Sequence, residues 1–144
     1  MVLRIWKNLH GKIRRLLRGA LRPARRRFFP AVGDIGETVA LGFLLRRGYD
    51  VVARNVRIGS GELDMIAFDQ DTLVFVEVKT RSRHDGFAPQ SAVTRRKEEQ
   101  LMRLARAFCH RYGLEKYPAR FDVVAVVLQD GPPHVEHFVG AFRK

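Results

Sequence analysis

The stretch "ELDMIAFDQDTLVFVEVKTR", residues 62–81, constrains the fold of this chain more than any other part of it. Two runs rich in apolar and β-branched residues are separated by Gln70 and Asp71, and this spacing predicts a β-hairpin with a two-residue loop. In such a hairpin Asp69 faces Thr72, which fixes the register of every other pair along the two strands. The sequence therefore predicts an antiparallel pair of largely buried strands.

This register predicts that charged side chains of the two strands meet. Asp64 is expected to face Glu77, and Glu62 to face Lys79. Opposed side chains have Cβ atoms about 5 Å apart, so two carboxylates can bind one cation of the kind that prefers oxygen ligands, Mg²⁺ or Mn²⁺. Lys79 shares the face of Glu77, from which it can position a water molecule or stabilise charge on a phosphate. The alternative is that Glu77 and Lys79 make ordinary ion pairs with Asp64 and Glu62 on an exposed face.

The segments around the hairpin predict an α/β fold with the order helix, three strands, helix and two strands. Helices are expected over residues 33–49 and 94–113, with Asp34 as the N-cap of the first helix and Gly48 as its stop signal. Runs of apolar and β-branched residues predict strands over residues 51–58, 62–68, 72–81, 120–128 and 134–140. The strand over residues 120–128 is interpreted as strictly apolar.

Glu37 in the first expected helix has two interpretations. Asp34 and Glu37 have the spacing of a capping box, in which Glu37 bonds back to the backbone at the helix start. Glu37 also shares a helix face with Ala40, Leu41 and Leu44, the stripe expected to pack on the sheet, which would direct its carboxylate inward. The two interpretations are compatible.

The positive charge of the chain is concentrated before the expected domain. The net charge is +12, and residues 1–33 contain ten Lys and Arg and no acid. We therefore divide the chain into a basic amphipathic extension and linker, residues 1–32, and an α/β domain, residues 33–144. The extension can contact nucleic acid, contact an anionic membrane surface through residues 1–21, or remain a solvated tail. The lack of a long apolar stretch and a lone Cys109 favour a cytoplasmic protein.

Other polar residues give weaker signals. His134 and His137 are three residues apart, but we interpret them as residues of an exposed edge strand, because no acid or Cys pattern accompanies them. Arg95, Arg96 and Lys97 begin the second expected helix and oppose its dipole, which indicates either a phosphate contact or a solvated face.

These residues together resemble a known family. The helix acid Glu37, Asp64 on one strand, and Glu77 and Lys79 on the next are similar to the motif of the PD-(D/E)xK nuclease superfamily. The segments "GETVALGFLLRRGY", "GELDMIAFD", "LVFVEVKTR" and "RFDVVAV" more closely resemble the YraN-like bacterial family, which is uncharacterised and endonuclease-like. The resemblance covers residues 33 to about 128, and it departs from the superfamily pattern at Leu63, where Pro is nominal.

The resemblance implies a restriction-endonuclease-like core, in which a mixed β-sheet is flanked by helices. It implies that Asp64 and Glu77 hold Mg²⁺ or Mn²⁺ together with a backbone carbonyl, that of Val78, and that Lys79 assists a hydrolytic water. The expected function is a metal-dependent nuclease that hydrolyses DNA phosphodiester bonds, with branched or single-stranded DNA as candidate substrates. The alternative is a non-catalytic nucleic-acid-binding accessory protein that retains the nuclease fold, because a shared fold does not establish activity.

Overall fold

A single five-stranded sheet forms the centre of the protein, and one long helix lies on each of its faces. The structure, a computed structural model, describes residues 11–15, 32–82 and 93–142. Within these ranges the elements are α2 (Val32–Arg46), β1 (Asp50–Ile58), β2 (Gly61–Asp69), β3 (Thr72–Ser82), α3 (Arg95–Tyr112), β4 (Ala119–Leu128) and β5 (His134–Phe142). The predicted α/β class and the order of elements are confirmed.

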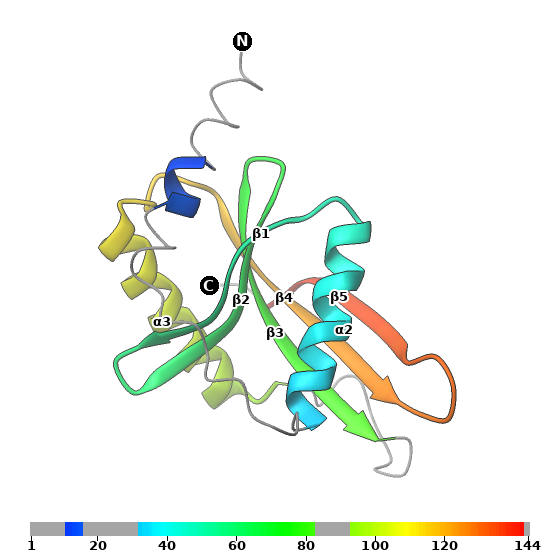
Figure 1. Ribbon diagram of the computed structural model, residues 1–144. Coiled ribbons are helices and arrows are strands. Elements are labelled where there is room, and N and C mark those ends of the chain that lie inside the picture. The colour runs from blue at the N-terminus through cyan, green and yellow to red at the C-terminus, as the bar shows by residue number, and fades with distance from the viewer. Residues whose placement is uncertain (1–10, 16–31, 83–92, 143–144) are drawn as a thin grey trace.

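The sheet is mixed, with its strands in the order of the sequence, β1-β2-β3-β4-β5. The pairs β1–β2, β2–β3 and β4–β5 are antiparallel, whereas β3 and β4 run parallel. Parallel neighbours need a crossover connection, and the segment that contains α3 supplies it (Figure 1). In this order β2, β3 and β4 are interior strands, and helices cover both faces of the sheet, which explains the nearly continuous runs of buried residues in β3 and β4.

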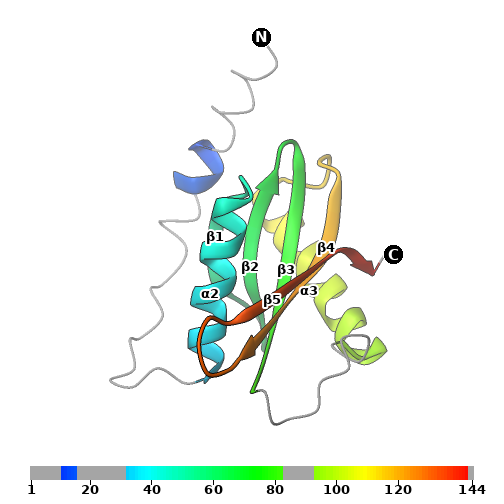
Figure 2. The same ribbon diagram turned by 90° about the vertical axis from the view of Figure 1, so that its right-hand side faces the viewer.

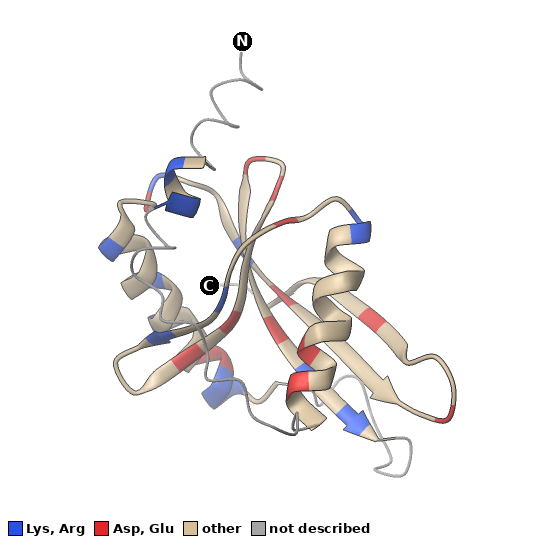
Figure 3. Cartoon of the chain, viewed as in Figure 1, with Lys and Arg blue, Asp and Glu red and all other residues tan. Residues whose placement is uncertain are grey.

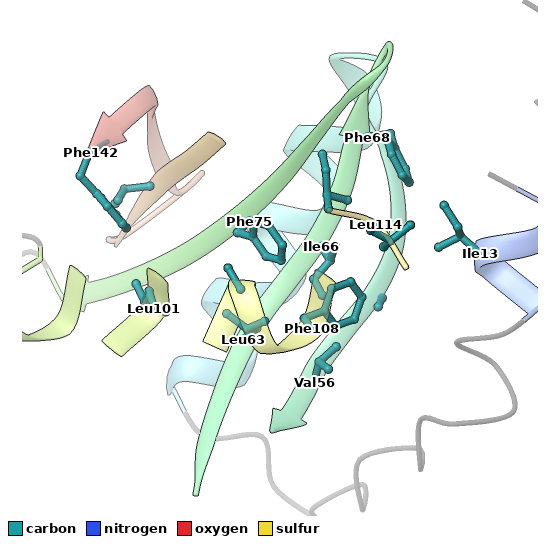
Figure 4. Packing of buried hydrophobic residues seen from close by; sticks show 14 residues of the cluster. Ile13, Val56, Leu63, Ile66, Phe68, Phe75, Leu101, Phe108, Leu114 and Phe142 are labelled. Carbon is teal, nitrogen blue, oxygen red and sulfur yellow. The ribbon is translucent and has the colours of Figure 1, made fainter. Parts of the chain in front are cut away.

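The helices α2 and α3 lie on opposite faces of the sheet (Figure 2), and alternating side chains of the strands build a separate hydrophobic cluster under each helix. On one face, Ala40 and Leu44 of α2 pack against Val74 and Val124, among others. On the other face, α3 contributes a stripe of buried side chains, of which Phe108 is the largest (Figure 4). Burying a side chain of that size stabilises the fold by roughly 1.5–3 kcal/mol, so the two clusters fix both helices on the sheet.

The helix predicted over residues 94–113 agrees with α3 to within one residue at each end, whereas the helix predicted over residues 33–49 extends three residues past the end of α2 at Arg46. α3 begins after the N-cap Thr94 and ends at Gly113, which adopts the left-handed conformation (φ 65°). Gly48 follows α2 with φ 85° and acts as the expected stop. Asp34 is not an N-cap, because α2 is described from Val32 and Asp34 lies within its first turn. A carboxylate at that position still interacts favourably with the helix dipole.

The predicted N-terminal extension is described only at residues 11–15 and at Val32; its other residues lie outside the described ranges. Residues 11–15 form a helical turn, and Ile13 is 3 % exposed in the cluster on the α3 face, where it points towards Leu114 (Figure 4). Arg14 makes an ion pair with Asp50 at the start of β1. This part of the basic segment therefore packs on the domain. No helix in the described ranges is long and apolar enough to cross a membrane.

Candidate functional site

The candidate site lies where β2 and β3 separate. The predicted hairpin register is confirmed over five pairs, from Asp69 with Thr72 to Met65 with Val76, and the ladder then ends. Beyond this point the strands diverge, as Figure 1 shows, and we call this region the fork. Acidic residues of β2, β3 and α2 lie around it (Figure 3).

Asp64 explains why the ladder ends where it does. Its side-chain Oδ2 accepts a hydrogen bond of 2.8 Å from the backbone N–H of Val78, so a carboxylate takes the place of a backbone carbonyl of β2. Neither of the two predicted oppositions, Asp64 with Glu77 and Glu62 with Lys79, is part of the ladder. Glu62 instead accepts a hydrogen bond from Arg57 Nε of β1, at 3.1 Å. The fork is thus a specific junction that the Asp64 side chain helps to form.

The Asp64 carboxyl is strongly affected by its surroundings. Burial, and after it the negative charge of Glu77, raise its pKa to about 7, and the charge of Glu37 acts in the same direction. The hydrogen bond from Val78 and the positive charge of Lys97 act against this rise. The Asp64 carboxylate is therefore costly to keep charged in the metal-free fold, first because it is buried and then because Glu77 lies near it.

Glu77 is the most buried acid of the fork, with only 5 % of its surface exposed. Its Oε1 lies 3.3 Å from Lys79 Nζ and 3.4 Å from Lys97 Nζ. Its Oε2 is buried and has no hydrogen-bond partner among the described residues. The predicted proximity of Glu77 and Lys79 is confirmed, but the exposed-face alternative is wrong for Glu77. An unpaired buried carboxylate oxygen costs free energy, which a bound cation or donor would offset.

Lys97 is a residue of the fork that the sequence did not assign to the site. It lies in the first turn of α3, where a positive charge opposes the helix dipole at a cost of roughly 0.3–1 kcal/mol. The contact with Glu77 gives this unfavourable position a structural reason. The sequence signal was present in the basic start of the helix, but only the packing of α3 against the sheet shows which carboxylate Lys97 meets.

Glu37 reaches the fork from α2. Its Oε2 accepts a hydrogen bond of 2.8 Å from Asn55 Nδ2, and Arg54 Nη2 lies 3.8 Å from the same oxygen. The inward interpretation therefore holds, while the capping-box interpretation fails with Asp34 inside the helix. Asn55 has a left-handed backbone (φ 51°) and lies between the two β1 residues that pair with Leu63 and Met65. Glu37 thus binds the left-handed residue of β1 that lies beside Asp64 of β2.

α2 can bring Glu37 this close because of a glycine. A Cβ atom built on Gly36 would lie 1.8 Å from Oγ1 of Thr80 on β3. Real Cβ atoms do not approach other atoms so closely, so any larger residue would push the helix away from the sheet. The residue before Glu37 therefore sets the distance between the helix acid and the strands.

The acids of the fork do not form a complete metal centre by themselves. No group of three His, Cys, Asp or Glu side chains in the described ranges is placed to hold a metal ion. Asp64 and Glu77 supply oxygen ligands of the type that Mg²⁺ and Mn²⁺ prefer, and Glu77 Oε2 is an unused one. These two residues fit a metal ion whose remaining ligands are backbone oxygen, water or substrate.

A second polar cluster lies on the face of the sheet that α2 covers. Asp122, which is fully buried, accepts hydrogen bonds from His137 Nε2 (2.9 Å), Arg120 Nε (3.0 Å) and the backbone N–H of Gly140 (3.0 Å). Although burial opposes it, these bonds lower the pKa of Asp122. The interpretation of His137 as exposed was wrong, since its side chain is 2 % exposed. His134 is exposed and contacts Glu136. The cluster ties β5 to β4.

A hollow of about 740 Å³ lies apart from the fork, between the second half of α3 and the β4–β5 pair. Its lining is mainly apolar and aromatic, and it includes Tyr117, Phe121 and Phe142. None of the four predicted site residues lines it, so the candidate site depends on the fork and not on this hollow.

Comparisons with known proteins concern the same part of the chain. The family model described as "Uncharacterised protein family UPF0102" matches residues 36–126. A UPF0102 protein of Trichlorobacter lovleyi is 46 % identical over 114 residues, which cover 78 % of this chain and 90 % of the relative. A UPF0102 protein of Solibacter usitatus is 43 % identical over 129 residues, 88 % of this chain and 97 % of the relative. The matched region contains Glu37, Asp64, Glu77 and Lys79.

Proposed function

We propose that this chain, which belongs to the uncharacterised protein family UPF0102, is a divalent-metal-dependent nuclease that hydrolyses DNA phosphodiester bonds at the fork. The observation that carries the proposal is the acid pair of the fork. Burial, and after it the charge of Glu77, raise the pKa of Asp64, and Glu77 keeps a buried oxygen without a described partner. Repelling acids in a partly dry site are a frequent feature of functional sites. With Lys79, they support membership of the PD-(D/E)xK superfamily.

In this proposal Asp64 and Glu77 would hold Mg²⁺ or Mn²⁺, with the backbone carbonyl of Val78 as a further oxygen ligand. When bound, the ion lowers the pKa of a bound water and polarises a phosphate. The protein supplies the orientation of both carboxylates. The Val78 N–H fixes one oxygen of Asp64, and Glu77 is held in β3 by its pairing with Val123 of β4. Glu37 acts as a positioning residue through Asn55.

The two lysines of the fork provide the positive charge that phosphoryl transfer requires. Hydrolysis of a phosphodiester adds negative charge to the phosphate oxygens in the transition state, and preorganised cations stabilise that charge. Lys79 and Lys97 bring two ammonium groups to the same carboxylate oxygen from different elements. We assign Lys79 to the attacking water or the scissile phosphate, because it shares the strand and the face of Glu77.

A second candidate function is favoured by one observation. Lys79 and Lys97 already offset the charge of Glu77 without a metal, and no three potential ligand side chains of the described residues converge. A protein that binds nucleic acid without cleaving it would have the same arrangement. The two candidates differ in whether the fork binds a divalent ion and whether DNA is cut.

A cleavage assay with matched variants separates the candidates. Duplex, single-stranded and branched DNA are incubated with Mg²⁺ or Mn²⁺ and with wild type, Lys79→Ala, Asp64→Ala or Glu62→Ala, while Mn²⁺ binding is measured by titration calorimetry. Glu62 is the matched control, because it is an acid two residues from Asp64 whose partner is Arg57 and not a residue of the fork. Thermal melts of all four proteins exclude loss of folding.

The expected results differ for each variant. Lys79→Ala should abolish cleavage and keep most Mn²⁺ binding, Asp64→Ala should lose both, and Glu62→Ala should change neither. A folded wild type that binds DNA but cuts none of the substrates with either ion would refute the nuclease function and support the accessory-protein function. Loss of both properties in Glu62→Ala alone would place the site elsewhere.

A further inference from the structure

The described part of the chain is electrically asymmetric across the sheet. α3 carries six Lys and Arg against two Glu, a net charge of +4, whereas α2 carries one Arg against two acids, a net charge of −1. Figure 3 shows basic residues along α3 and in residues 11–15, while acids lie on the first part of α2. A surface that is positive on one side of a domain attracts polyanions to that side.

The basic residues of α3 lie largely on its exposed side. Leu101, Ala105 and Phe108 face the sheet and are buried, whereas the exposed surface includes Arg96 and Arg103. Neither of these arginines has an ion-pair partner among the described residues. Arg96 also adds to the positive charge at the helix start, which the dipole disfavours. The described contacts therefore give neither arginine a role in stabilising the fold.

The exposed arginines form a line that begins at the fork. Arg96 is next to Lys97, which contacts Glu77. Arg96 and Arg103 are seven residues apart and so lie on one side of the helix, about 10 Å from each other. Arg111 lies about 22 Å further along the helix than Arg96 and about 60° around its axis, and this length corresponds to roughly six or seven base-pair steps along the axis of B-form DNA.

The other end of the line is continued by the N-terminal segment. Ile13 packs in the cluster that contains Leu114, directly after α3. This anchor places the exposed Lys12 and Arg15 beside the end of the helix that is remote from the fork. The described residues 11–15 are therefore joined to the positive side of the domain.

From these observations we propose that the exposed side of α3, from Arg96 to Arg111 and onward to residues 12–15, is a binding surface for the phosphate backbone of nucleic acid. We call it the α3 track. Its partner rests on the proposed function, which supplies nucleic acid as the polyanion, and its role is to lead one strand into the fork. Phosphate contacts of this kind position a nucleic acid without reading its sequence.

The test measures binding without cleavage. Fluorescent duplex and single-stranded DNA are titrated with protein in EDTA at several salt concentrations, using wild type, Arg96→Gln/Arg103→Gln and the control Arg46→Gln/Arg47→Gln. The control removes the same charge from the exposed end of α2 on the opposite face. Thermal melts compare the stability of the three proteins, and Arg103→Gln/Arg111→Gln replaces the first variant if that variant unfolds.

The α3 track predicts a local effect. Loss of two phosphate contacts should lower the log–log salt slope for duplex DNA by about 1.8, and should weaken binding at 0.1 M salt by roughly 60-fold, while the control keeps the wild-type slope. An equal loss of affinity in the variant and in the control would overturn the α3 track. It would still show that the protein binds nucleic acid. A wild type that binds neither DNA would overturn the track and the proposed function together. Anionic vesicles, tested in parallel, would identify a membrane surface if Arg96 and Arg103 matter there and not for DNA.

Discussion

Replacing Asp64 with Asn should stabilise the metal-free protein at every pH above about 4, by an amount that grows until the pH passes about 7. Burial and the charge of Glu77 raise the pKa of Asp64 from 3.8 to about 7. The folded protein therefore binds this proton more tightly than the unfolded chain, so the free energy of unfolding falls as the pH rises from about 4 to 7. The rise from 3.8 to about 7 corresponds to roughly 4 kcal/mol of stability, which is present near pH 4 and lost once the pH is above about 7.

Asn keeps an oxygen that can accept the Val78 N–H and removes the charge. Asp64→Asn should thus be more stable than wild type by up to about 4 kcal/mol at pH 8, and the two should be equal near pH 4. For a chain of this size, the difference at pH 8 corresponds to a rise in Tm of roughly 10–15 °C. Calorimetric melts in EDTA between pH 4.5 and 8 measure it, with Glu62→Gln as control. A stability difference independent of pH, or a less stable variant at pH 8, would refute the argument.

Two further predictions concern the partners of buried acids. Lys97→Met should tighten Mn²⁺ binding measured by calorimetry, because it removes one ammonium group that competes for Glu77 Oε1; weaker binding would show that Lys97 supports the metal site instead. Asp122→Ala should lower the free energy of unfolding by about 3–5 kcal/mol in chemical denaturation, because Arg120 and His137 lose their shared acceptor. The exposed Asp130→Ala should stay within about 0.5 kcal/mol of wild type, and a similar loss in both variants would contradict this role.

Short-range signals were sufficient to predict the elements and the hairpin register. The two-residue loop at Gln70 and Asp71 fixed which residues of β2 and β3 oppose each other, and five pairs agree. Thr94 and Gly113 bound α3 as local backbone chemistry requires. Each of these features depends on residues that are close in the sequence, so one sequence contains all the information they need.

The errors share a different origin, which is long-range packing. The ladder ends before Asp64 because a side chain replaces a backbone acceptor, and a regular register cannot represent this. His137 is buried because β5 pairs with β4 and brings the ring to Asp122. The interpretation of the strand over residues 120–128 as strictly apolar was wrong, because it contains this buried acid. Lys97 joins the fork only because the crossover places the start of α3 over β3.

The fork also shows why a site of this type needs the positive charge that surrounds it. Glu77 is buried next to Asp64, and without Lys79 and Lys97 the metal-free fold would contain two repelling acids in a partly dry place. The lysines lower that cost, but they occupy Oε1 and leave Oε2 unpaired. A divalent ion bound at the fork would therefore share Glu77 with the lysines and free an ammonium group to meet a phosphate. If so, the metal-free fold and the proposed phosphate contact depend on the same two side chains.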